Sequence, residues 1–128
     1  MSWNYNPFTG QLDKVDTGGP GSASPWVTVS DTVVATSTGA VDSIANASFY
    51  ALKYIITIYN DANTAYRTFE YNVLNNNGSY KDTLNHNLKA GGLSVDVDSV
   101  NNAGTFELQI TNNESYDVNI ELAKLVLA

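Results

Sequence analysis

Residues 93–111 read LSVDVDSVNNAGTFELQIT, and this stretch is the most informative about the fold. Apolar and polar residues alternate over 93–98 and again over 106–111. Such alternation places apolar side chains on one face of a β-strand and polar side chains on the other. Between the two segments, the sequence NNAG at 101–104 is rich in residues that form turns. The stretch is therefore predicted to be an antiparallel β-hairpin with one buried face.

Other segments show the same period. The run 49–59 is the most apolar part of the chain, and both of its faces are apolar. This predicts a central strand, or one that also faces a partner subunit. Segment 66–74 alternates and is followed by Asn77-Gly78, the strongest short hairpin signal, so a strand at 79–84 should pair back on it. Residues 27–30 and 118–127 are further predicted strands, and 36–48 is predicted to be a loop.

In the last predicted strand, the alternation of apolar and polar residues shifts by one position. Apolar residues occupy even positions up to Leu122 and odd positions from Leu125 onward. A β-bulge inserts one extra residue and would return the later leucines to the buried face. We therefore predict a bulge near Ala123 and Lys124.

Together these segments define the domain organisation. Strands separated by about ten residues are typical of a β-sandwich. We predict an all-β fold: an antiparallel, jelly-roll-like β-sandwich of about seven to eight strands over residues 26–128, with an extended N-terminal arm. Residues 17–25, TGGPGSASP, are predicted to be a Gly/Pro/Ser linker. Residues 1–16 form the predicted anchoring arm.

The alternation also predicts which side chains form the core. Inward-facing apolar residues of the strands should meet between two sheets. The predicted core residues are Val29, Leu52, Tyr54, Ile56, Phe69, Tyr71, Leu93, Val95, Phe106, Leu108, Val118 and Ile120.

The composition argues against several kinds of partner. The net charge is -7 and only six residues are basic, so we expect no nucleic-acid partner, because phosphate binding needs clusters of lysine and arginine. The absence of cysteine excludes disulfides and thiolate sites. No apolar run is long enough for a membrane-spanning helix, and residues 1–6 lack the features of a signal peptide. We therefore expect no membrane partner and folding in a cytosol.

No catalytic or metal site is predicted. His86 is the only histidine, and although Asp82 is nearby in the sequence, no nucleophile motif accompanies them. Asp96 and Asp98 lack the spacing of a calcium-binding loop and are interpreted as the polar face of a strand. We therefore expect a protein that is not an enzyme and that uses no cofactor.

The arm carries the candidate interface residues, which are Trp3, Tyr5, Pro7, Phe8 and Leu12. A segment this short cannot bury its own aromatic side chains. Because the linker separates it from the domain, we predict that these residues anchor the chain in a groove of another protein. The alternative is that the segment folds back on the sandwich and covers a sheet edge.

Two parts of the sequence resemble a known family. The segment Asn6-Pro7-Phe8-Thr9-Gly10-Gln11-Leu12-Asp13 is similar to the Asn-Pro-Phe-Thr-Gly-x-Leu-Asp opening of small virion proteins of tailed phages, especially marine and cyanobacterial ones. Segments 41–44, 48–56 and 66–70 resemble a β-domain in structural proteins of the same phages. The segments that carry the two resemblances lie between residues 6 and 70.

This resemblance implies a non-enzymatic accessory component of the virion surface, such as a capsid decoration protein, a head fibre or a small tail protein. It implies no catalytic residues. The expected partners are other capsid or tail proteins, and the expected location is the virion. Repeated virion sites favour a homo-oligomer, with a trimer among the arrangements considered. The alternative function is a carbohydrate- or receptor-binding adhesion module of a phage tail.

Overall fold

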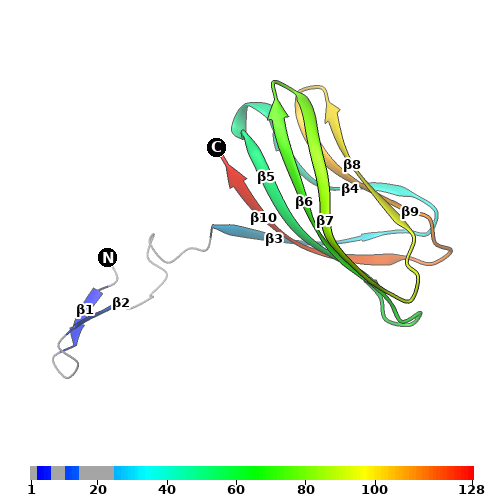
Figure 1. The fold of residues 1–128 in the computed structure, drawn as a ribbon, viewed down its shortest axis with the longest axis horizontal. Coiled ribbons are helices and arrows are strands. Elements are labelled where there is room, and N and C mark those ends of the chain that lie inside the picture. Colours follow the sequence, from blue (N-terminus) through cyan, green and yellow to red (C-terminus); the bar gives the residue numbers. More distant parts are fainter. Residues whose placement is uncertain (1–2, 7–10, 15–24) are drawn as a thin grey trace.

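The computed structural model describes residues 3–6, 11–14 and 25–128, and for the first two segments it gives the course of the backbone only. Two antiparallel sheets form the domain (Figure 1). The larger sheet has the strand order β3 (Trp26–Val33), β10 (Val118–Leu127), β5 (Ala51–Asn60), β6 (Ala65–Asn76) and β7 (Ser79–Ala90). The smaller sheet has the order β4 (Thr38–Ala45), β9 (Thr105–Asn112) and β8 (Val95–Asn102). A short 3-10 turn, η2 (Asn46–Ser48), joins β4 to β5.

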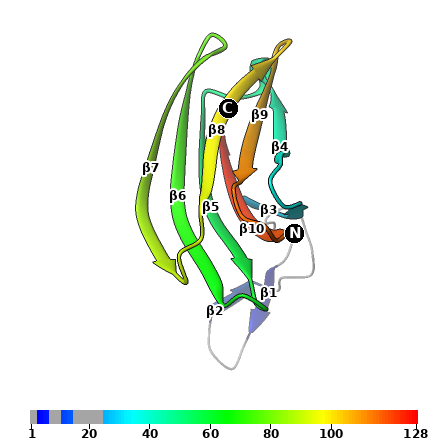
Figure 2. The same cartoon turned by 90° about the vertical axis from the view of Figure 1, so that its right-hand side faces the viewer.

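The predicted all-β antiparallel sandwich is confirmed. In Figure 2, β4 and β9 lie on one side of the molecule and β6 and β7 on the other. Both predicted hairpins are present, because β6 pairs with β7 and β8 pairs with β9. The turn residues Asn77 and Gly78 have φ of 52° and 88°, the left-handed conformation that a two-residue hairpin turn requires. The central strand of the larger sheet is β5, as its two apolar faces indicated.

The core between the sheets follows the predicted alternation. Every predicted core residue is buried except Val29, which is half-buried against the core on the edge strand β3. The core also contains apolar residues beyond the predicted set. Some of the largest of these are Phe49, Ile58, Ile110 and Leu122.

Two strand predictions were wrong. The segment 36–48, predicted to be a loop, contains β4 over Thr38–Ala45. Its alternation is hidden because the register against β9 shifts between Ala40 and Asp42, which leaves Val41 as an extra residue. The strand predicted at 79–84 extends to Ala90. Its second half has no apolar alternation because almost every residue of this edge strand is exposed, and a second register shift lies opposite Thr68–Glu70.

The predicted bulge in β10 is also wrong. This strand pairs with β3 over Val118–Leu125 and with β5 over Asn119–Leu127 without any register shift. Lys124 therefore keeps the inward phase of Leu122 and lies in the core face, 8% exposed. The leucines that the bulge would have turned inward, Leu125 and Leu127, lie on the opposite face. A buried partner for Lys124, described below, replaces the bulge as the explanation of the phase change.

The N-terminal arm contains a pairing that the sequence analysis did not predict. Strand β1 (Trp3–Asn6) pairs antiparallel with β2 (Gln11–Lys14), and Trp3 is the register partner of Lys14. These two strands form a two-stranded sheet of their own. The backbone of the arm is thus a paired ribbon over these segments and not a single extended strand.

Candidate functional site

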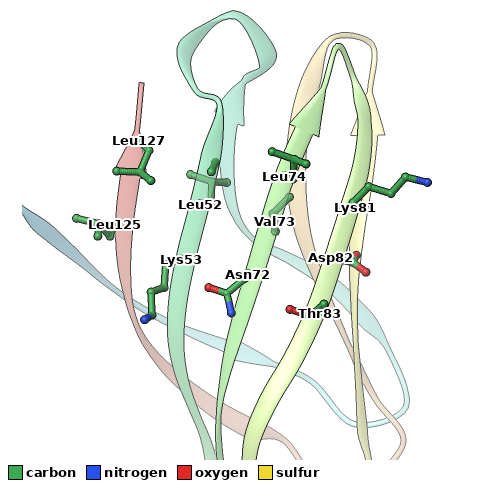
Figure 3. Close-up of a pocket in the computed structure, with 11 residues that line it drawn as sticks. Leu52, Lys53, Asn72, Val73, Leu74, Lys81, Asp82, Thr83, Leu125 and Leu127 are labelled. Atoms are coloured by element: carbon green, nitrogen blue, oxygen red, sulfur yellow. The ribbon is translucent and has the colours of Figure 1, made fainter.

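The outer face of the larger sheet, which is the face turned away from β4, β9 and β8, carries an unusual row of apolar side chains. A groove of about 430 Å³ crosses β10, β5, β6 and β7 on this face (Figure 3). Leu74 and Leu127 are 54% and 58% exposed, and they flank Ala51 in the strand register. The residues that line this outer-face groove are Ala51, Leu52, Lys53, Asn72, Val73, Leu74, Lys81, Asp82, Thr83, Leu125 and Leu127.

The regular register of β10 explains why leucines lie in the groove. Leu125 is aligned with Lys53 of β5, and Leu127 with Ala51. Because Lys124 points inward, its neighbours in sequence must point outward. The outward position of Leu125 and Leu127 therefore follows from the same strand phase that places Lys124 in the core.

The whole chain is strongly acidic, whereas the outer-face groove contains basic side chains as well. Lys53 and Lys81, two of the six basic residues, line it. The Lys53 ammonium lies 3.0 Å from Glu70, whose other carboxylate oxygen is 3.1 Å from Nε2 of His86. In a chain with a net charge of -7, this region carries a balanced set of charges. It is a part of the surface that another acidic molecule can approach without strong repulsion.

The first strand of the domain, β3, begins beside β10, which contributes Leu125 and Leu127 to the groove. Trp26, the first residue of β3, is the register partner of Leu125. The predicted anchor residues lie in the arm: Trp3 and Tyr5 in β1, and Leu12 in β2, where only the backbone is described. Pro7 and Phe8 lie outside the described residues. The role of these five residues in an interface stays a prediction.

A second hollow lies at the end of the sandwich where β4 passes to β5, β6 turns into β7, and β8 turns into β9. We call it the loop-end hollow. Its volume is about 910 Å³. The residues that line it are Asn46, Ala47, Ser48, Phe49, Tyr50, Asn75, Asn77, Gly78, Asn101 and Ala128.

Side-chain amides hold the loops around this hollow together. The Nδ2 group of Asn75 donates to the carbonyl oxygens of Asn46 and Phe49, both at 2.9 Å. Asn101 donates from Nδ2 to the carbonyl oxygen of Gly78 at 2.9 Å. A Cβ atom on Gly78 would lie 2.9 Å from this same Nδ2 atom, and Gly78 has a φ of 88°, so both the contact and the backbone conformation favour glycine. The Asn-rich loops, which sequence reasoning treated only as turns, thus form one connected framework.

The residues considered as catalytic or calcium-binding candidates from the sequence do not come together in the structure. His86 lies on the outer face beside Glu70, and its side chain is 78% exposed. Asp82 instead accepts a hydrogen bond from the hydroxyl of Tyr71. Asp96 and Asp98 are exposed on β8, as the alternation predicted. Within the described residues, no group of three or more His, Cys, Asp or Glu side chains is placed to hold a metal ion.

Two hydrogen-bond networks, each built on a buried tyrosine, join the sheets. Asp42 of β4 lies 2.9 Å from the Lys124 ammonium and accepts a hydrogen bond of 2.8 Å from the Tyr54 hydroxyl. On the other side of the core, Tyr71 donates to Asp82, and Ser99 of β8 lies 2.7 Å from the same hydroxyl. Burial raises the pKa of Tyr54 far above its ordinary value, and the negative charge of Asp42 and its hydrogen bond raise this pKa further. Burial and the hydrogen bond to Asp82 raise the pKa of Tyr71 in the same direction.

These pKa shifts predict a loss of stability at alkaline pH. The unfolded chain releases tyrosine protons near pH 10, whereas folded Tyr54 and Tyr71 retain theirs. Their contribution to the free energy of unfolding is therefore complete below about pH 10 and is lost as the pH rises above it. Absorbance at 295 nm should show two of the eight tyrosines ionising only with unfolding. If all eight ionised while the circular dichroism of the fold persisted, the networks would be wrongly assigned.

Fold and surfaces together define an all-β sandwich with an apolar outer face and a polar, Asn-rich end. No family model and no curated protein sequence matches this chain. Among solved structures, it is similar to an Acinetobacter baumannii phage AM24 tailspike protein, with a TM-score of 0.42 and 9% sequence identity. The aligned region covers 80% of this chain and 26% of that protein, so the chain spans about a quarter of its length. In the described residues, no helix is long and apolar enough to cross a membrane.

Proposed function

We propose that this chain is a non-enzymatic structural protein of a phage virion. In this proposal it is an accessory surface component, such as a capsid decoration protein, a head fibre or a small tail protein, and its N-terminal arm attaches it to other virion proteins. The observation that carries the proposal is the outer-face groove, which exposes Leu74 and Leu127 and is also lined by Leu125, the register partner of Trp26 at the start of β3. The resemblance of residues 6–13 to the opening of small phage virion proteins supports the same assignment.

Exposed apolar surface beside a tethering arm favours a protein that works by contact. Contiguous exposed apolar patches commonly mark sites of protein interaction. The acidic remainder of the surface disfavours binding to the packaged genome. The proposed partners are therefore other capsid or tail proteins and further copies of this chain, and the proposed location is the virion, after synthesis in the host cytoplasm.

We propose that the outer-face groove also mediates contact between copies of the chain. Lys53 and Lys81 make the groove a region where two acidic chains can approach. Replacing the exposed Leu127 with glutamate should shift the oligomer to monomer in sedimentation velocity, because it adds charge to the contact. Leu88→Glu is the matched control, since Leu88 is 68% exposed on the same sheet but does not line the groove. A wild-type chain that sediments as a monomer at all concentrations would contradict the proposal.

Deletion of residues 1–16 tests the attachment. In phage particles made with the deleted chain, mass spectrometry should no longer detect it in purified virions. Circular dichroism of the isolated deletion variant should keep the strand signal of residues 26–128, because both sheets lie within that segment. Incorporation of the deleted chain at wild-type copy number would overturn the proposed role of the arm. Absence of the full chain from virions would overturn the structural function itself.

A specific observation favours a second candidate function. Tyr50 is 73% exposed and lines the loop-end hollow. Exposed aromatic side chains at loop tips suit carbohydrate or receptor recognition, where one face of the ring is apolar and the hydroxyl is polar. A carbohydrate- or receptor-binding adhesion module is therefore the alternative to a purely structural component.

A further inference from the structure

The loop-end hollow is chemically unlike the rest of the surface. None of the ten residues that line it has a charged side chain, although the chain contains 19 charged residues, from 13 acidic and six basic. Amide, hydroxyl and aromatic groups make up its functional surface. A charged ligand would find no countercharge on a side chain there, and an apolar ligand would cover polar groups of the lining that have no partner in the protein. The lining therefore selects a neutral ligand that carries many hydroxyl or amide groups.

Two hydrogen bonds fix the backbone of Tyr50 at the rim of the hollow. Its backbone N–H donates to the carbonyl oxygen of Leu127 at 2.7 Å, and its own carbonyl oxygen accepts from the N–H of Asn75 at 2.8 Å. The residue is thus fixed by neighbours on both sides while its side chain stays 73% exposed. Because the backbone is already fixed, only the two side-chain torsions of Tyr50 lose freedom when a ligand binds to the ring.

Hydrogen-bonding groups are available beside this ring. Within the part of the chain that the structure describes, neither the Asn77 amide nor the Ser48 hydroxyl has a hydrogen-bond partner. Asn46, Asn75 and Asn101 are instead committed to the framework of the loops. The framework amides set the shape of the hollow, and the Asn77 amide and the Ser48 hydroxyl are free to bond to a ligand.

We propose that the loop-end hollow binds a neutral oligosaccharide. The apolar face of one pyranose ring packs on the ring of Tyr50, and sugar hydroxyls hydrogen-bond to Asn77 and Ser48. The volume of about 910 Å³ lies within the range of sites that hold small organic ligands. The proposal deepens the second candidate function, and it holds for the isolated chain whether or not the protein is assembled in a virion.

The test uses the full chain on an array of neutral and acidic oligosaccharides, followed by titration calorimetry with the strongest neutral probe. We expect neutral glycans to bind in preference to acidic ones. Tyr50→Ala should weaken binding by about tenfold or more, as loss of a central aromatic contact does, and Tyr50→Phe should retain most of the affinity. Asn77→Gly, which preserves the left-handed turn, should also weaken binding.

The controls distinguish a local site from a general effect. Tyr66→Ala alters another exposed tyrosine, 39% exposed and outside the hollow, and should leave the affinity unchanged. Lack of binding to every neutral glycan, binding only of acidic glycans, or equal losses from Tyr50→Ala and Tyr66→Ala would each overturn the proposal. None of these outcomes affects the deletion experiment on residues 1–16, so the structural role is tested separately.

Discussion

Replacement of Asp42 by alanine should lower the free energy of unfolding by about 3–5 kcal/mol, because it leaves a buried charge without a partner. The Lys124 ammonium lies 2.9 Å from the Asp42 carboxylate, and both side chains are 10% exposed. The substitution also removes the acceptor of the Tyr54 hydroxyl, and the Tyr54 side chain is fully buried. Urea unfolding followed by circular dichroism measures the change.

A double variant separates the cost of the unpaired Lys124 charge from the cost of the lost acceptor for Tyr54. Asp42→Asn with Lys124→Met keeps an acceptor for Tyr54 and removes the buried ammonium while filling a similar volume. Replacement of a buried ion pair by well-matched neutral side chains is often close to neutral, so the double variant should lie within about 1–2 kcal/mol of the wild type. A loss below about 1 kcal/mol for Asp42→Ala alone would show that Lys124 finds water or another partner.

Replacement of Phe106 by alanine should cost about 3–5 kcal/mol, the range for removing a buried phenylalanine and leaving a cavity. Phe106 is fully buried in β9, and its ring packs edge-on against Tyr80 at 5.0 Å and Phe49 at 5.6 Å. It also stacks on Tyr54 at 6.4 Å. The residue therefore connects the smaller sheet to strands of the larger sheet and to the lining of the loop-end hollow.

The matched control for this effect is Leu88→Ala, which removes an apolar side chain that is 68% exposed. Such a surface change should stay within about 0.5 kcal/mol. The Phe106 variant should also broaden the amide signals of the loop-end framework in NMR spectra, because Phe49 both contacts Phe106 and lines the hollow. Comparable stabilities for the two variants would mean that Phe106 is not at the centre of the core.

Local periodicity was sufficient to predict most of the fold. Alternation identified the inward face of β5, β6, β8 and β9, and turn chemistry identified the hairpins at Asn77-Gly78 and at 101–104. These features depend on neighbours in the sequence, since side chains alternate between faces along a strand and positive φ favours asparagine and glycine. Prediction failed at β4, where the extra residue Val41 interrupts the alternation.

The candidate surfaces were much less predictable. Sequence reasoning placed the interface in the arm alone, although the two apolar faces of 49–59 offered one signal for the outer face. The loop-end hollow left a weaker signal, in the asparagines spread over three turns. Both surfaces are assembled from segments that are distant in sequence. The side chains that line them acquire a shared surface only after the sheets have formed.

Lys124 shows which features of the fold follow from the sequence alone and which depend on tertiary contacts. By itself, the sequence of this protein determined most of the strands, the tight turns and most of the apolar residues that enter the core, because these follow from repeating local geometry. It did not determine that β10 continues without a bulge, because that depends on Asp42, a carboxylate on the opposite sheet. Only the tertiary structure supplies this partner, which makes a lysine tolerable in the core and thereby turns Leu125 and Leu127 outward to form the groove.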